Sequence, residues 1–463
     1  MTRMRSNMLL FVVCVAALLC APCAAQTINA KQIDDKTIRV TVPGRFETDF
    51  TKRKGFGHTW YDLKHDPEKI HNLAPVDDEN GFFWIKNGPG PERPAGGRSW
   101  YANPAKAVRL VEANPVRARV RLKGVHMCYG KPWKKMEWPE LGFELTWTIY
   151  PTGHVFGDYT LVADQPVKLH HFLAIIKSTG HWGPLGTGVG KGEIHPASEA
   201  GDGVKPSGRK PCAWVLQHSN GPTHFTDILM VFQDGKYGGT YWNMGYRDRD
   251  YRTGLNILAM FPDKAVPAGG MHIPVMFRIA EDMSDVKTAA LHANAYRAPG
   301  KLTVTQGKVV TDDAGDYDGD GYNESEGCYV LRSTPVGVAF TLPGAKTPRM
   351  TPAFKILDWK GEAPKAVVLG ARDLALGTHF NATVTDGVLV VQILSDVSED
   401  ASLAIKQGQT RVSAPLQREN GDMLLLRSST AYGMNGITRL PSRQPRKGRK
   451  YLMRMPLNAW RMQ

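Results

Sequence analysis

Alternation of apolar and polar residues with a period of two dominates this 463-residue chain. In residues 141–150 the odd-numbered positions from Phe143 to Ile149 are apolar and the intervening ones are polar, which predicts a half-buried strand. The 47 glycines and 31 prolines exceed the usual share of roughly one residue in eight, so turns are frequent and long helices few. Further strands are predicted at 116–123, 155–162, 213–217, 228–232, 255–260, 273–279, 338–342, 366–369 and 388–394. The pattern predicts an all-β fold of antiparallel sandwich-like sheets.

One stretch interrupts the strands. Residues 280–298 contain neither glycine nor proline, Ser284 can cap a helix there, and Pro299 with Gly300 ends it. A single helix between two series of strands is typical of a connector between domains. We therefore expect the following organisation: a large β domain at 26–283, a helical linker at 284–300, a small β domain at 301–415 and a basic tail at 416–463.

The first 25 residues have the features of a signal peptide. A short basic region precedes thirteen apolar residues, and cleavage is expected after Ala25. Thirteen helical residues span only about 20 Å, too short for a bilayer core of about 30 Å, so no transmembrane segment is expected. A lipoprotein anchor at Cys20 or Cys23 is less favoured, because Leu19 and Pro22 precede these cysteines. The sequence predicts a secreted or periplasmic protein.

The formal net charge of +14 is concentrated at the ends of the chain. Residues 1–26 contribute +2 and residues 439–463 contribute +8, leaving +4 for the body. The residues between the two ends therefore carry too little net positive charge to attract polyanions in general, and nucleic acid is not an expected partner. The mature chain keeps Cys128, Cys212 and Cys328, which allow at most one disulfide. Serine-hydrolase, zinc-protease and nucleotide-binding motifs are missing.

A run of acidic residues at 316–326 has the spacing of a calcium loop. The candidate ligands are the side chains of Asp316, Asp318, Asp320, Glu324 and Glu326 and the carbonyl of Tyr322, with Gly321 at the sharp turn. The run resembles the loops of EF-hands and dockerins, although its twelfth position is glycine and its flanks are predicted strands. We expect a structural Ca²⁺ site within a β domain. The alternative is an acidic surface turn, which mutual repulsion of the carboxylates disfavours.

Two further clusters are candidates for binding a glycan. Arg117, Arg119 and Arg121 alternate with apolar residues, which predicts that they share one face of a strand. They could line a groove for a sulfated or uronic-acid polymer, or they could form a solvated face that deters aggregation.

The second cluster is aromatic and polar and covers 237–252, with two histidines upstream. Aromatic rings stack on sugars, and arginine pairs with carboxylates. The candidate binding residues are Tyr241, Trp242 and Asn243, and the candidate catalytic residues are His224, Tyr246, Arg247 and Arg252. The alternative is a polar hairpin that packs on a sheet.

The series formed by 114–121, 143–153 and 266–279 resembles the β-supersandwich domains of the galactose-mutarotase-like class, which recur in polysaccharide lyases. The region after residue 301 is similar to β modules that follow such domains in secreted bacterial proteins. The resemblance implies a carbohydrate-active protein, and three hypotheses follow. The favoured one is a lyase that cleaves a uronic-acid polymer. The others are a non-catalytic glycan-binding or envelope protein, and a matrix protein held together by Ca²⁺.

Overall fold

The computed structural model describes a chain built almost entirely of strands. The residues described are 26–52, 54–69, 83–86, 105–129, 135–168, 171–179, 185–188, 192–195, 214–217, 227–232, 240–247, 252–260, 265–280 and 286–407. They belong to one compact unit, residues 1–410. Over these ranges the only helix is α2 (Val286–Arg297), so the predicted all-β fold is confirmed. The predicted signal peptide and basic tail lie outside the described residues.

Within the part of the chain that the structure describes, no helix has the length and apolar character needed to span a bilayer.

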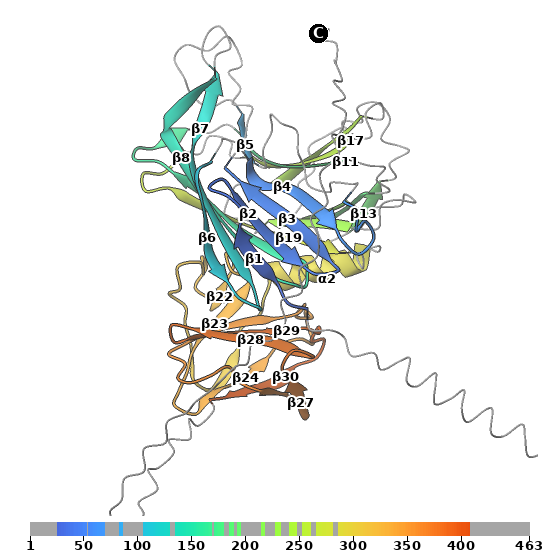
Figure 1. Cartoon of the computed structure of the whole chain (residues 1–463), viewed down its shortest axis with the longest axis vertical. Coiled ribbons are helices and arrows are strands. Elements are labelled where there is room, and N and C mark those ends of the chain that lie inside the picture. Colours follow the sequence, from blue (N-terminus) through green and yellow to red (C-terminus); the bar gives the residue numbers. More distant parts are fainter. Residues whose placement is uncertain are drawn as a thin grey trace, which may run out of the picture. The chain divides into compact units, whose positions relative to one another are not determined.

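A nine-stranded antiparallel sheet organises the N-terminal part of the chain (Figure 1). Its order is β13-β12-β14-β15-β19-β9-β8-β7-β6. The strands are β6 (Ala105–Ala113), β7 (Ala118–Tyr129), β8 (Lys135–Ile149), β9 (His154–Val162), β12 (Leu185–Gly188), β13 (Gly192–His195), β14 (Trp214–Gln217), β15 (Asp227–Phe232) and β19 (Met271–Ala280). The alternation predicted for 141–150 is confirmed, because Phe143, Leu145, Trp147 and Ile149 are all buried in one core.

Two four-stranded sheets and a short strand pair complete this part. One sheet has the order β1-β2-β3-β4 and the other β16-β17-β11-β5. The strands are β1 (Asn29–Gln32), β2 (Thr37–Val42), β3 (Phe46–Thr51), β4 (Lys54–Asp62), β5 (Phe83–Lys86), β11 (His171–Thr179), β16 (Thr240–Arg247) and β17 (Arg252–Met260), and the pair is β10 (Val167–Lys168) with β18 (Ala265–Val266). Phe46, Phe50 and Trp60 share a core with Trp147 and Phe277, which joins the first sheet to the large one.

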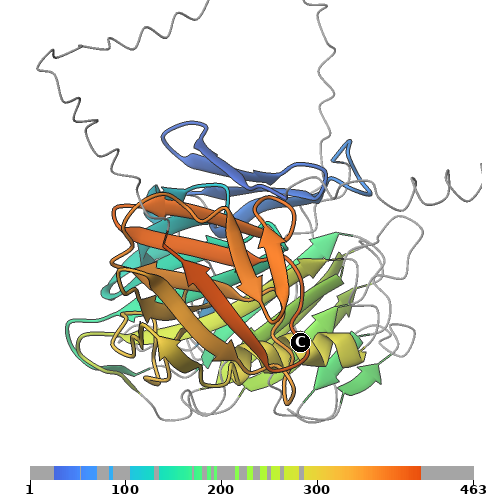
Figure 2. The same cartoon turned by 90° about the horizontal axis from the view of Figure 1, so that it is seen from below.

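The C-terminal module contains two sheets, coloured orange to red in Figure 2. Their orders are β20-β24-β30-β26-β27 and β21-β23-β25-β29-β28, with β22 also paired to β23. The strands are β20 (Thr303–Gln306), β21 (Lys308–Val309), β22 (Tyr322–Asn323), β23 (Cys328–Arg332), β24 (Gly337–Leu342), β25 (Ala353–Leu357), β26 (Ala366–Leu369), β27 (Arg372–Ala375), β28 (Phe380–Thr385), β29 (Val388–Ile393) and β30 (Ala401–Lys406). Residues of both sheets, among them Phe340 and Phe354, meet in a second core.

Helix α2 lies within this second core. Ala289, Ala293 and Tyr296 are buried in it together with residues of β15 and β19 and of the C-terminal module. The helix ends where predicted, and the buried Arg349 guanidinium donates to the carbonyls of Ala295 and Ala298 at 3.3 and 2.9 Å. These bonds satisfy carbonyls that a helix end leaves unpaired. The predicted helix is confirmed, whereas the domain boundaries on either side of it stay predictions.

The start of β7 differs from the predicted strand. Val116 and Arg117 lie in a turn, because the Asn114 side-chain oxygen accepts hydrogen bonds from both of their backbone N–H groups, each at 2.9 Å. Such a turn is typical of asparagine. The strand therefore begins at Ala118, and Arg117 is separated from the row of cations that follows it.

Candidate metal centre and predicted catalytic hairpin

The acidic loop connects β21 to β22 in the C-terminal module. Asp316 organises it: one carboxylate oxygen accepts from the Gly319 N–H at 2.7 Å and the other from the Gly321 N–H at 2.8 Å. Gly321 has a φ of +91°, and a Cβ there would lie 2.2 Å from Val309 Cγ1. The sharp turn predicted at this position therefore requires glycine.

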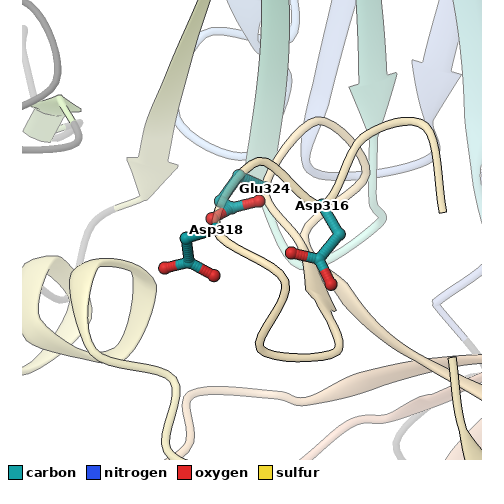
Figure 3. A group of neighbouring side chains, drawn as sticks. All are labelled: Asp316, Asp318 and Glu324. Atoms are coloured by element: carbon teal, nitrogen blue, oxygen red, sulfur yellow. The ribbon is translucent and has the colours of Figure 1, made fainter. Parts of the chain in front are cut away.

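Three of the predicted ligands come together. Carboxylate oxygens of Asp316, Asp318 and Glu324 lie within 4.8 Å of one another (Figure 3). Glu324 is buried, and it accepts a hydrogen bond from the Tyr317 N–H at 3.0 Å. Hard carboxylate oxygens on a tight loop are ligands that Ca²⁺ prefers, so this cluster could hold a metal.

The electrostatics of the loop indicate an excess of negative charge. Burial, with Asp318 and Asp316 nearby, raises the pKa of Glu324 to about 7 against the hydrogen bond from Tyr317. Burial and the same two aspartates raise the pKa of Asp320 to about 6. A bound cation would favour the ionised form of both groups. Asp320 does not belong to the three-carboxylate cluster; its Oδ1 accepts from the Tyr322 N–H at 2.8 Å.

Glu326 lies outside the cluster and is used differently. Its buried carboxylate is 2.8 Å from Arg117 Nη1, 3.2 Å from Arg119 Nη1 and 3.2 Å from Lys355 Nζ. Burial alone would raise the pKa of Glu326, but these three cations outweigh it and lower the pKa to about 2. We call Glu326, Arg117, Arg119 and Lys355 the buried ion cluster.

The three arginines predicted to bind substrate occupy different environments. Arg117 is buried, and its Nε also contacts Glu112 at 3.0 Å. Arg119 is mostly buried in the same cluster, whereas Arg121 is exposed by 40% and pairs with Glu144 at 3.1 Å. The geometry therefore separates Arg121 from the other two, and glycan binding by these residues stays a prediction.

The predicted catalytic residues are divided between a described hairpin and a segment outside it. Tyr241, Trp242, Asn243, Tyr246 and Arg247 lie on β16, and Arg252 begins β17. The register pairs Tyr246 with Thr253 and Arg247 with Arg252. His224 lies outside the described residues, and the catalytic roles stay predictions.

A small cavity lies between the large sheet and the C-terminal module. Its volume is about 40 Å³, enough for a few water molecules and too small for a sugar. His154 and His292 line it, with 3.2 Å between His154 Nε2 and His292 Nδ1. Cys328, near the same interface, is a free buried thiol, and burial raises its pKa to about 12.

A group that local sequence patterns do not reveal joins the acidic loop to the large sheet. The Tyr317 hydroxyl lies 3.0 Å from His272 Nδ1, and the two rings stack with centroids 4.8 Å apart. The same nitrogen is 3.2 Å from Asp158 Oδ1 and 2.9 Å from Thr160 Oγ1. Tyr317 was inside the recognised loop, but nothing in the local sequence connects it with a histidine 45 residues away.

No family model matches the chain, and no curated protein matches its sequence. Solved structures similar to it include the heparan sulfate lyase HepC from Pedobacter heparinus, at 6% identity and a TM-score of 0.28, covering 63% of this chain and 39% of that one. An alpha-galactosidase, AgaB from Geobacillus stearothermophilus, has 8% identity and a TM-score of 0.34, covering 54% and 41%. A galactose 1-epimerase from Lactobacillus acidophilus has 9% identity and a TM-score of 0.28, covering 55% and 99%.

The neighbours thus include a heparan sulfate lyase and a galactose 1-epimerase. The chain spans only about two fifths of the length of the lyase and of the alpha-galactosidase. The function proposed below therefore rests on the residues of this chain.

Proposed function

We propose that this chain is an exported carbohydrate-active protein, and specifically a polysaccharide lyase that cleaves a uronic-acid polymer by β-elimination. The observation that carries the proposal is the register of the β16–β17 hairpin, which pairs Arg247 with Arg252; Tyr246 precedes Arg247 in the chain. Two arginines at paired positions of a hairpin suit a carboxylate, because guanidinium groups bind it through paired hydrogen bonds. The aromatic residues of β16 supply the ring surfaces that sugars stack on.

The reaction assigns one role to each group. An arginine neutralises the uronate carboxylate, which makes the adjacent carbon-bound proton more acidic. A base, His224 or Tyr246, removes that proton, its electron pair forms a carbon–carbon double bond, and the bond to the glycosidic oxygen breaks. The other residue of the pair donates a proton to the departing oxygen. No metal takes part in these steps, and Ca²⁺ in the 316–324 loop is proposed as structural.

Replacing Tyr246 with phenylalanine is expected to lower the rate of elimination by about 10²–10⁴-fold, because a proton donor or acceptor is lost while the ring is kept. The measurement is the ultraviolet absorbance of the unsaturated product during incubation with a panel of anionic polysaccharides. Tyr61→Phe, in β4 of another sheet, is the matched control and should keep full activity. Unchanged elimination in Tyr246→Phe would remove Tyr246 from the scheme, and no product from any polymer with a folded protein would refute the lyase.

A non-catalytic, Ca²⁺-stabilised glycan-binding protein is the second candidate. The contacts of the acidic loop favour it, because they tie the loop to helix α2 and to the large sheet. Glu324 is buried, and its carbonyl accepts from the Tyr296 hydroxyl of α2 at 3.5 Å. A cation at this place would stabilise the fold without contact to a substrate. Glycan binding without any unsaturated product would favour this candidate.

Calcium is expected to raise the unfolding temperature of the protein. A cation present at about 100 times its dissociation constant adds about 2.7 kcal/mol to the free energy of unfolding. Asp316→Asn should abolish most of the calcium-induced shift, because one ligand charge is lost while an acceptor for the loop is retained. Thermal unfolding with Ca²⁺ and with a chelator measures the shift, and Asp373→Asn, at an exposed position of β27, is the control. Equal shifts in the two variants would contradict calcium binding at this loop.

A further inference from the structure

We infer that the outer face of the large sheet, outside the proposed catalytic hairpin, binds a uronate-containing polysaccharide chain. The face is formed by Arg109 on β6, Arg121 and Lys123 on β7 and His272 on β19, and Tyr317 of the acidic loop borders it. We call these five residues the outer strip. They lie on the side of the sheet opposite the core that contains Val120, Leu122 and Leu145.

The cations of the outer strip outnumber the acids that face them. Arg121 and Lys123 share a single carboxylate, that of Glu144, at 3.1 and 2.5 Å. Arg109 is exposed and stands directly opposite Arg121 in the register of β6 and β7. Among the described residues Arg109 has no ion-pair partner. Like charges at directly opposed positions are destabilising, so an anion lying over this pair would be favoured.

The other end of the outer strip is an aromatic surface with hydrogen-bonding groups. His272 is exposed by 46% on its side chain and stacks on the Tyr317 ring. Asp158, Thr160 and Ser325 hold the pair in place: the first two contact His272 Nδ1, and the Ser325 hydroxyl lies 2.9 Å from the Tyr317 hydroxyl. A ring that is fixed in this way loses little side-chain entropy when a sugar stacks on it.

The register connects the two ends in one row across the sheet. Lys123 pairs with Glu144, Glu144 with Thr160, and Thr160 with His272. Adjacent strands are about 4.8 Å apart, so the strip extends about 19 Å from β6 to β19. An array of this length, with cations at one end and stacked rings at the other, fits several sugars of an acidic chain better than one small anion. Arginine at the cationic end favours carboxylate groups, which it binds bidentately.

Binding is tested with polygalacturonate as the probe, by affinity electrophoresis of the mature protein at low salt. The double variant Arg109→Gln/Lys123→Gln is expected to bind at least about tenfold more weakly, because two charge-assisted contacts are lost. His272→Ala should also weaken binding by several fold, and unfolding temperatures should show that both variants fold. The exposed pair Lys346→Gln/Lys365→Gln removes the same charge from the C-terminal module and should leave the affinity unchanged.

The experiment separates this inference from the proposed function. Using the Tyr246→Phe protein as the background limits cleavage of the probe, and product absorbance recorded on the same samples reports any turnover. Binding that depends on the outer strip, without product, supports the strip and refutes only the lyase. Equal affinity in the strip variant and the control overturns the inference. If the strip variant lost binding to dextran sulfate but kept its binding to polygalacturonate, the assignment to uronates would be overturned.

Discussion

Replacing Glu326 with glutamine is expected to lower the free energy of unfolding by about 3 kcal/mol. Removing one partner of a buried ion pair costs about 3–5 kcal/mol, because the remaining charges stay buried without compensation. The lower end applies here, since Arg117 keeps Glu112 and Lys355 keeps Asp313 after the change. Urea unfolding monitored by fluorescence measures the difference, with Glu399→Gln as the exposed control.

The result has a clear meaning in either direction. A loss near the expected value would show that the buried ion cluster holds the acidic loop against β7. Unchanged stability in Glu326→Gln would show that the desolvation of these charges already offsets their attraction. The calcium-induced shift in unfolding temperature is a second measurement on this variant, because Glu326 lies outside the three-carboxylate cluster. The variant should therefore retain a calcium-induced shift that Asp316→Asn loses.

The second large effect is a loss of stability in mild acid. Burial lowers the pKa of His126 to about 3, and burial with the nearby Arg278 and His292 lowers the pKa of His154 well below its usual value. The unfolded chain takes up protons at these histidines near pH 6.5, whereas the folded chain keeps them neutral. Stability present above pH 6.5 is therefore lost as the pH falls toward 3. Each histidine contributes at most about 1.4 kcal/mol per pH unit.

Unfolding in urea at several pH values between 7 and 4.5 measures this loss. His126→Phe is the informative variant, because its ring can pack against Phe143 in place of the imidazole. It loses the contact between His126 Nε2 and the Tyr159 hydroxyl, so its stability at pH 7 should fall. The free energy of unfolding of this variant should nevertheless fall less steeply than that of the unmodified protein as the pH is lowered. An unchanged slope would show that His126 is not the group that responds to acid.

Local sequence patterns were sufficient for the alternating strands such as 143–149, for the helix and for the turn of the acidic loop. The alternation of Phe143 to Ile149 and the glycine at position 321 both have short-range physical causes, namely side-chain burial and backbone φ. The three-carboxylate cluster was predicted for the same reason, since its ligands lie within nine residues of one another. In each of these features the residues that contact one another in space are also close in the sequence.

The roles of Glu326 and Arg117 were not predictable in this way. Glu324 and Glu326 are two residues apart, yet one joins the acidic cluster and the other contacts arginines more than 200 positions earlier. Arg117 continues the alternation of Arg119 and Arg121, but the Asn114 turn removes it from that row. Such contacts depend on the packing of the C-terminal module against the large sheet. The roles assigned to His224 and to the hairpin residues stay predictions.

Helix α2 buries its apolar residues against both β regions. Tyr296 of the helix, Phe156 of the large sheet and Phe354 of the C-terminal module are buried in one continuous core. A Cβ at Gly327 would lie 2.2 Å from the Phe156 ring, so the backbone of one region fits directly against a side chain of the other. The segment 301–407 is thus a module in its topology that shares a core with helix α2 and with the large sheet. Shuffling it onto another domain would leave an apolar face in water on both halves.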